Sequence, residues 1–406
     1  MRFLFPTGRG WLILFFHLIC LALAFINQSI FTLVISGLCL AILAASLVCA
    51  IICLHGIEVR RGPACDAHAG EPTDLPLVLR NRCPWRSQSI VAFEEMDCVP
   101  DKWLKQIVPP LAARKELRLE RIFTPVRRGC FKLEKLFLRS GDPAGLFRRE
   151  KIFRLPEELL VLPAITPLAE LQLEATASTA ALADRSSARV GTSQEFYGIR
   201  EYRTTDGIRF INWRATARHR RLMVTEFEHN AHAAVVLLVD APKAYAGRGD
   251  FSNLERQICA AASLVAQCAE RYCNLAFAAG GDQSRWLLPA PATDQQTKLM
   301  EMLARLQPGV SPLETALEQL LPRLEPRSLV ICLGLHENPD LAIQLTGLAQ
   351  AGMEVRWSYA APQDFPGPLS WKTWKTTRRH AEIPPGLLSP RRVLAQDPLE
   401  IGLAPS

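Results

Sequence analysis

The feature that most constrains this chain is an apolar segment near its N-terminus. From Trp11 to Leu54 the sequence contains no Asp, Glu, Lys or Arg, and its main polar interruption is Asn27-Gln28-Ser29. At about 1.5 Å per residue in a helix, a segment of this length crosses a hydrocarbon core of about 30 Å twice. We therefore predict that residues 1–56 form a transmembrane hairpin of two helices joined by a tight polar turn.

Basic residues flank this segment on both sides. Arg2 and Arg9 precede it, and Arg60 and Arg61 follow it, so the positive-inside rule predicts that both termini are cytoplasmic. A cleaved signal peptide ending near Ala22-Leu23-Ala24 is the alternative, although the second apolar run would still anchor the chain. The twelve cysteines show no paired spacing, which fits reduced thiols in a protein that faces the cytosol.

Residues 57–165 show short apolar or alternating runs separated by Pro, Gly, Asn and Asp. This spacing predicts a small antiparallel β domain, either a sandwich or a partial barrel. Its second half carries many cations that alternate with apolar residues, which indicates a solvated strand face; contact with lipid headgroups is the lesser alternative. Residues 166–194 are rich in Ala, Ser and Thr without apolar periodicity, and we expect a linker there.

Residues 231–362 alternate between buried-strand and helix patterns. Continuous apolar runs such as "AAVVLLVDA", "CNLAFAAG" and "SLVICLGL" are separated by helical periodicity. We predict helices that start near Thr293, Ser311 and Pro339, with Ser311 as a helix cap. This alternation predicts a doubly wound α/β domain with a parallel sheet, and Asp240 falls at the carboxyl end of a strand, where ligands bind in such sheets.

A stretch rich in arginine precedes this domain. Residues 200–221 read "REYRTTDGIRFINWRATARHRR" and contain seven arginines together with large aromatic side chains. Asp206 is placed to cap a short helix with Ile208, Ile211 and Ala215 on one stripe. Three interpretations remain open: a clamp between domains anchored by packing and ion pairs, a docking surface for an acidic partner, and a nucleic-acid interface.

The same stretch, followed by "LMVTEFE", resembles the signature of the domain-of-unknown-function 58 family of bacterial membrane proteins, which carry a C-terminal von Willebrand factor A-like domain. We place this signature motif at residues 195–230. "DPAGLF" at 142–147 and the N-terminal hairpin resemble the family as well. The predicted clamp or partner-binding residues are those that match the signature most distinctively: Arg200, Glu201, Tyr202, Asp206, Arg209, Trp213 and Arg218.

Many von Willebrand A domains bind Mg²⁺ through Asp-x-Ser-x-Ser, a Thr from another loop and a further Asp. This chain keeps Asp240, but Pro242 and Ala244 replace the two serines, and only Ser311 could stand in for the Thr. Since neither replacement offers a side-chain oxygen, we regard Asp240 and Ser311 as remnants of a degenerate site and predict no bound metal or other cofactor.

A run of acids and histidines also needs an interpretation: Glu226, Glu228, His229 and His232 could in principle bind zinc, yet they lack the His-Glu-x-x-His order. We interpret them as part of a connector. Residues 363–406 form a basic, proline-containing tail.

The resemblance implies an inner-membrane protein that works with a MoxR-type AAA+ ATPase and, in some cases, with a transglutaminase-like membrane protein. We therefore predict a non-enzymatic adaptor or scaffold in the assembly or remodelling of envelope proteins. The alternative is a membrane-tethered nucleic-acid-binding protein that uses residues 200–221. The net charge of +7 is too mild to identify a partner.

Overall fold

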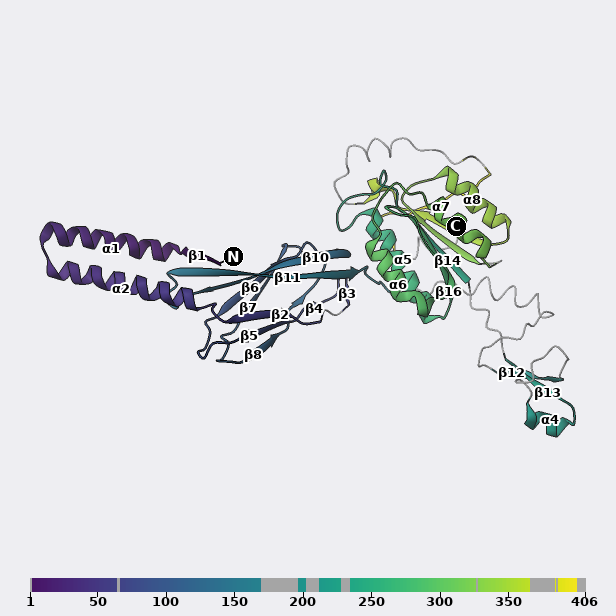
Figure 1. Cartoon of the computed structure of the whole chain (residues 1–406). Coiled ribbons are helices and arrows are strands. Elements are labelled where there is room, and N and C mark those ends of the chain that lie inside the picture. The colour runs from purple at the N-terminus through teal and green to yellow at the C-terminus, as the bar shows by residue number, and fades with distance from the viewer. Residues whose placement is uncertain are drawn as a thin grey trace. The chain divides into compact units, whose positions relative to one another are not determined.

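The computed structural model describes residues 2–63, 66–168, 196–201, 212–227, 234–325, 328–365, 384 and 386–399. The chain divides into two compact units, one made mainly of Met1–Ile165 and the other mainly of the residues from Thr166 onward. Figure 1 labels their elements. The predicted linker lies outside the described residues except for 166–168, as does most of the predicted tail.

The first unit begins with a pair of long apolar helices, as predicted. Helix α1 spans Gly8–Asn27 and α2 spans Ile30–Ile52, and both are long and apolar enough to cross a membrane. Gln28 makes the turn between them in the left-handed conformation, with φ of 48°. His17 on α1 and Ser36 on α2 form a buried hydrogen-bonded pair, with 3.0 Å between Nδ1 and Oγ.

The start of α1 is fixed to the β-rich part of the same unit. Strand β1 (Arg2–Pro6), which the sequence did not predict, pairs antiparallel with β11 (Phe147–Leu162). Thr7 caps α1 and donates its hydroxyl to Gly145 O at 2.6 Å. A Cβ on Gly10 would lie 2.3 Å from Leu146 O, so this contact requires glycine. The "DPAGLF" turn therefore holds the helical hairpin.

The β-rich part confirms the expected antiparallel strands. One sheet has the order β1-β11-β10-β6-β7, and a second has the order β2-β5-β8. The two share an apolar core with residues from the end of α2. Two short pairings complete it: β3 lies parallel to β11, and β4 pairs with β9. The bounds are β2 Ile57–Arg61, β3 Ala67–His68, β4 Thr73–Asp74, β5 Leu77–Asn81, β6 Ile90–Glu95, β7 Trp103–Val108, β8 Glu116–Leu119, β9 Ile122–Phe123 and β10 Gly129–Gly141.

A buried charge cluster lies inside this β-rich part. Glu94 on β6 is fully buried and contacts the guanidinium groups of both Arg61 and Arg121, the latter at 3.0 Å. Arg121 also donates to Leu75 O, and burial lowers its pKa. The Arg61 side chain is only 4% exposed. Arg61, one of the basic residues that follow the hairpin, is therefore paired within the fold.

The second unit contains a mixed sheet with the order β16-β15-β14-β17-β18-β19. The central strands β14 (Ala234–Asp240), β15 (Asn274–Gly280), β17 (Leu329–Gly334) and β18 (Glu354–Tyr359) are parallel, as predicted. Two edge strands were not predicted. Strand β16 (Arg285–Pro291) pairs antiparallel with β15, and β19 (Arg391–Arg392) adds a short parallel strand from the C-terminal region.

Helices cover both faces of this sheet. Helices α7 (Leu313–Leu320) and α8 (Pro339–Gln350) share one core with Val236 and Leu238 of β14. Side chains alternate between the faces of a strand, so Val235, Leu237 and Val239 point the other way, where α5 (Asn253–Glu270) contacts β14, β15 and β17. Helix α6 spans Ala292–Arg305, and short 3₁₀ turns occur at Leu321–Arg323 and Pro362–Asp364.

Helix α7 begins later than the sequence indicated. Its N-cap is Pro312, which is extended and makes no side-chain cap, so the prediction of Ser311 as the cap was wrong. Ser311 instead exchanges two backbone hydrogen bonds with Gly281, at 2.9 and 3.0 Å. That bridge holds Ser311 in an extended conformation outside the helix.

Candidate functional site

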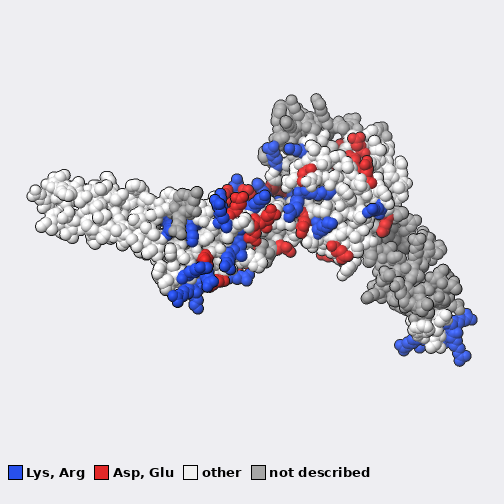
Figure 2. Space-filling model, in the orientation of Figure 1, with Lys and Arg blue, Asp and Glu red and all other residues white. Residues whose placement is uncertain are grey.

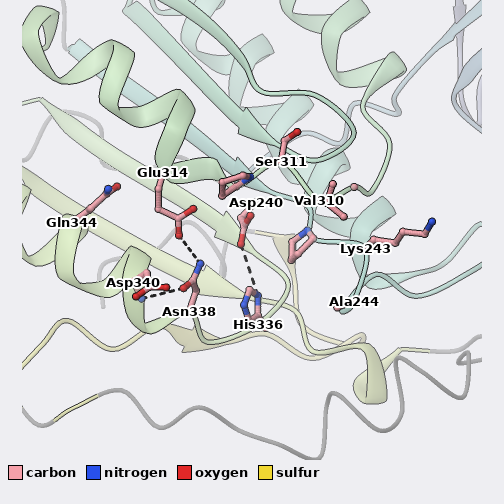
Figure 3. Close-up of a pocket in the computed structure, with 13 residues that line it drawn as sticks. Asp240, Lys243, Ala244, Val310, Ser311, Glu314, His336, Asn338, Asp340 and Gln344 are labelled. Atoms are coloured by element: carbon pink, nitrogen blue, oxygen red, sulfur yellow. Dashed lines mark hydrogen bonds and ion pairs between the residues drawn. The ribbon is translucent and has the colours of Figure 1, made fainter.

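A pocket lies at the point where the strand order of the second sheet reverses. Strand β14 comes first in sequence, β15 lies on one side of it and β17 on the other. In open α/β sheets, ligands bind beyond the carboxyl ends of the strands at such a reversal. Asp240 ends β14 and His336 follows β17, and both line a pocket of about 670 Å³ (Figure 3).

The wall formed by residues 309–312 is fixed by backbone contacts. Gly309 N donates to Ala241 O at 3.1 Å, and Lys243 N donates to Gly309 O at 2.8 Å. A Cβ at Gly309 would lie 2.0 Å from Gly281 O, so only glycine permits this close approach. Together with the Ser311–Gly281 bridge, these contacts hold the loop against the ends of β14 and β15. The pocket is therefore preorganised by the backbone.

Asp240 is a buried carboxylate without a hydrogen bond from any described residue. Its side chain is 6% exposed, and its Oδ2 lies 3.8 Å from His336 Nδ1. Burial raises the pKa of Asp240 to about 7, and the negative charge of Glu314 adds to the increase. At neutral pH this carboxyl group is thus close to its titration midpoint, and a cation brought into the pocket would favour its ionised form.

His336 forms the opposite side of the pocket floor. Its ring stacks on Tyr245 with 3.9 Å between the ring centroids, and burial lowers its pKa to about 4. The imidazole is therefore neutral at pH 7 and does not make an ion pair with Asp240. Its Nδ1 is buried and has no hydrogen-bond partner among the described residues. Two polar groups thus face the pocket without a partner.

A second acid in the pocket is held in place by an amide. Asn338 Nδ2 donates to Glu314 Oε1 at 2.8 Å, while Asn338 Oδ1 caps α8 by accepting from Asp340 N at 3.1 Å. Figure 3 shows Glu314 directed toward Asn338, and Asp240 directed toward His336. One cap residue therefore fixes the position of a pocket acid.

The donors in this pocket do not fit a magnesium shell. Mg²⁺ prefers oxygen ligands in octahedral geometry. Pro242 and Ala244 line the pocket without side-chain oxygens, and Figure 3 shows the Ser311 side chain directed away from Asp240. Among the residues that the structure describes, no three His, Cys, Asp or Glu side chains gather closely enough to hold a metal. Within the described part of the chain, these residues thus do not assemble a magnesium site at Asp240.

The arginine-rich motif is described only in part. Arg200 and Glu201 lie on strand β12 (Phe196–Glu201), which pairs antiparallel with β13 (Met223–Phe227). Trp213 and Arg218 lie on helix α4 (Trp213–His219). The remaining predicted motif residues lie outside the described part of the chain: Tyr202, Asp206 and Arg209.

Helix α4 starts later than expected. Asn212 is its cap and accepts from Ala215 N at 3.0 Å, so the prediction that Asp206 caps this helix was wrong. Asn is as good a cap as the Asp usual in the resembled signature, because either side chain offers the required acceptor oxygen. Met223 N donates to Thr216 Oγ1 at 3.0 Å and joins the helix to β13.

The described face of α4 is basic and exposed. Trp213 is 65% exposed. The short helix buries only Ala215 among its described side chains. Basic side chains gather over this element (Figure 2), and four of them are exposed: Arg214, Arg218, Arg220 and Arg221. The clamp and the docking surface both stay predictions for this motif.

The structure does not describe the side chains of the possible zinc ligands. Glu226 belongs to β13, and its side chain lies outside the described part. Glu228, His229 and His232 also fall outside the residues that the structure describes. Their interpretation as a connector stays a prediction.

Comparison with known families addresses the identity of the chain. Residues 198–350 match the family described as "Protein of unknown function DUF58". This part of the chain is a DUF58 domain. The resemblance seen in the arginine-rich signature is thereby confirmed, and the DUF58 match extends from β12 to the end of α8. It includes both the described motif and the Asp240 pocket.

One relative supports the DUF58 assignment. The uncharacterized protein YeaD of Bacillus subtilis (strain 168) is 24% identical over 182 residues, which cover 43% of this chain and 44% of YeaD. The match thus spans less than half of that relative's length.

Two solved structures show low similarity. A beta-glucosidase from Listeria innocua is 12% identical with a TM-score of 0.18, covering 26% of this chain and 16% of its own. A GH20 exo-beta-N-acetylglucosaminidase from Vibrio harveyi is 11% identical with a TM-score of 0.15, covering 75% and 57%. These scores are too low to support an argument about this chain.

Several residues that line the pocket were not singled out from the sequence as site residues: Glu314, His336 and Asn338. The sequence did contain a clue to His336, because this residue follows β17, and β17 pairs with β14, the strand that ends in Asp240. Applying the rule on strand ends to both central strands would have brought the two residues together.

Proposed function

We propose that this protein is a non-enzymatic adaptor of the bacterial inner membrane, which docks a partner through the basic surface of α4. The observation that carries the proposal is the exposed Trp213 on a helix with several exposed arginines. Trp and Arg are enriched among the residues that dominate binding energy at protein interfaces. A largely exposed indole beside guanidinium groups suits an acidic partner surface with an apolar pocket.

The way in which the helical hairpin is attached supports the proposed membrane orientation. Strand β1 precedes α1, yet it pairs with β11, which follows α2. Both ends of the hairpin are thus bound to one β-rich body, which supports a two-pass anchor with both termini on the same side. Arg9 and Arg60 flank the helices and favour the cytoplasmic side by the positive-inside rule.

The second unit supports a von Willebrand A-like domain. Its parallel strands lie in the order β15-β14-β17-β18, an antiparallel strand adds to the β15 edge, and helices cover both faces. Its pocket lies at the reversal of strand order, where such domains hold their ligands. In our proposal this domain binds by surface and charge complementarity, because Pro242 and Ala244 line the pocket where such a magnesium site would need side-chain oxygens.

The partner follows from the family resemblance. It implies a MoxR-type AAA+ ATPase, and also a transglutaminase-like membrane protein, in the assembly or remodelling of envelope proteins. A hexameric or multi-subunit ATPase with acidic surface loops would match the charge of α4. Nucleic acid is the competing partner for the same arginines, because guanidinium groups beside an indole also suit phosphates and bases.

Affinity purification from gently solubilised membranes, with and without a non-hydrolysable ATP analogue, tests this proposal. We expect nucleotide-dependent recovery of an AAA+ ATPase by the tagged full chain. The variant Trp213→Ala/Arg214→Ala/Arg218→Ala should lose it. A matched variant, Arg80→Ala/Arg114→Ala/Arg118→Ala, removes exposed cations from the β-rich unit and should retain it.

Two results would overturn the adaptor proposal. Recovery of nucleic acid without an ATPase, abolished by nuclease and by moderate salt, would assign the arginines to nucleic-acid binding. Equal recovery by the α4 variant and the unmodified chain would show that α4 is not the docking surface.

A further inference from the structure

We propose that the pocket at Asp240 is a binding site for a guanidinium group, carried either by an arginine side chain of a polypeptide or by a small free molecule. The inference stands on the pocket alone and does not depend on the docking role of α4. It assigns to the degenerate site an organic cation in the place where related domains hold a metal ion.

The charge of the lining favours a cation. Asp240, Glu314 and Asp340 contribute carboxylates, and no arginine lines the pocket. Lys243 is the basic exception, and Figure 3 shows its side chain directed away from Asp240. The deepest of these carboxylates, Asp240, is therefore not neutralised by a residue of the pocket itself.

Two polar groups of the pocket, Asp240 and His336 Nδ1, have no hydrogen bond from or to a described residue. The Asp240 side chain is 6% exposed, and its Oδ2 lies 3.8 Å from His336 Nδ1, beyond hydrogen-bond distance. His336 Nδ1 is itself buried without a partner among the described residues. Burial of a carboxylate is unfavourable unless a charge or hydrogen bonds compensate it. A ligand that supplies donors to both groups would satisfy them together.

A guanidinium group fits this arrangement better than a metal or an ammonium group. It is planar, keeps its charge and presents several N–H donors in a fork, so it can donate to a carboxylate and to a second acceptor at once. In the tautomer that carries its proton on Nε2, His336 offers Nδ1 as that acceptor. The His336 ring, which lines the pocket and stacks on Tyr245, adds an aromatic surface against which guanidinium groups pack well.

Isothermal titration calorimetry on the full chain in nanodiscs of zwitterionic lipid tests the site. The probe is a blocked Gly-Arg-Gly peptide, and the same peptide with citrulline in place of arginine is the neutral control. We expect the arginine peptide to bind at least about tenfold more tightly than the citrulline peptide. Asp240→Asn should reduce that affinity by about tenfold or more, since a charge-assisted hydrogen bond is lost.

A matched variant and two further ligands complete the test. Glu318→Gln removes an exposed charge from α7, one turn beyond Glu314, and should leave binding unchanged. Ethylguanidine distinguishes the sources: tighter binding of the peptide indicates a polypeptide arginine, whereas equal binding indicates a free small molecule. Equal binding of both peptides, loss of affinity in Glu318→Gln as large as in Asp240→Asn, or binding of Mg²⁺ at Asp240 in place of the peptide would overturn the proposal.

Discussion

The two units treat a buried carboxylate in opposite ways. Glu94, in the β-rich unit, is fully buried between two guanidinium groups. Asp240, in the α/β unit, is almost as deeply buried, but it lies 3.8 Å from a neutral imidazole and has no hydrogen bond from a described residue. In the first arrangement, the carboxylate has its charge partners within the protein. In the second arrangement, the carboxylate gains a charge partner only when a cationic ligand binds in the pocket. We therefore distinguish a structural acid, Glu94, from a binding acid, Asp240.

The largest expected effect is on the structural acid. Glu94→Ala leaves Arg61 and Arg121 buried without their common partner, so we expect a loss of about 3–5 kcal/mol in unfolding free energy. Urea-dependent pulse proteolysis of the full chain in detergent measures it. The control Glu58→Gln breaks an exposed pair with Arg82 and should change stability by less than about 1 kcal/mol. Equal effects of the two variants would contradict the distinction.

Next in size is the backbone of the pocket wall. Gly309→Ala places a Cβ against Gly281 O, and relief of this overlap must move the loop; we expect a loss of about 1–3 kcal/mol and loss of peptide binding. Gly347→Ala in α8 meets no atom within 4 Å and should stabilise by about 0.5–1 kcal/mol. Full binding by Gly309→Ala would show that the wall is not preorganised.

Removal of the binding acid, Asp240, should raise the unfolding free energy instead of lowering it. Asp240→Asn abolishes an uncompensated buried charge, so above pH 7 we expect a gain of about 2 kcal/mol in unfolding free energy. Urea titrations at pH 8 compare this variant with the unmodified chain. A loss similar to that of Glu94→Ala would mean that Asp240 has a partner after all.

The pH dependence sharpens the comparison further. Asp240 has its pKa raised from 3.8 to about 7, so its contribution to stability is present below about pH 4 and is lost as pH rises through 7. His336 has its pKa lowered from 6.5 to about 4, so its contribution is present above pH 6.5 and is lost as pH falls toward 4. Between pH 4 and 6.5, Asp240 therefore makes the unfolding free energy fall with rising pH, whereas His336 makes it rise.

Single variants should reveal each slope. The Asp240→Asn variant keeps only the pH dependence of stability that His336 causes, so its unfolding free energy should fall as pH decreases from 6.5 to 4. The His336→Gln variant keeps only the pH dependence of stability that Asp240 causes, so its unfolding free energy should fall as pH increases from 4 to 7. Pulse proteolysis across this pH range measures both. Parallel curves for the two variants would contradict the assigned directions.

Much of the fold followed from the sequence, because uncharged runs and continuous apolar strands carry their signal locally. The two long helices and the parallel strands β14, β15, β17 and β18 were all found in this way. Strand β16 was missed because "RWLLPAP" contains prolines and lies at an edge, where the apolar signal is weak. Strand β1 was missed because its partner lies on β11, far along the chain.

The site was harder to predict for the same reason. Asp240 was placed correctly at a strand end, but its neighbours come from loops distant in sequence, as His336 does. The pairing of Glu94 with Arg61 and Arg121 also depends on which strands meet, and no local pattern reports that. Ser311 and Asp206 were misjudged as helix caps because several nearby residues are good cap formers and spacing alone does not select among them.

The most direct test of the central claim is an infrared difference spectrum of the carboxyl groups, unmodified chain minus Asp240→Asn. At pH 6 we predict a protonated carboxyl band that is absent from the variant, because burial raises the pKa of Asp240 to about 7. Addition of the blocked Gly-Arg-Gly peptide at constant pH should abolish this band, since the guanidinium favours the carboxylate. No protonated band at pH 6, or a band unaffected by saturating peptide, would contradict a buried acid kept for a cationic ligand.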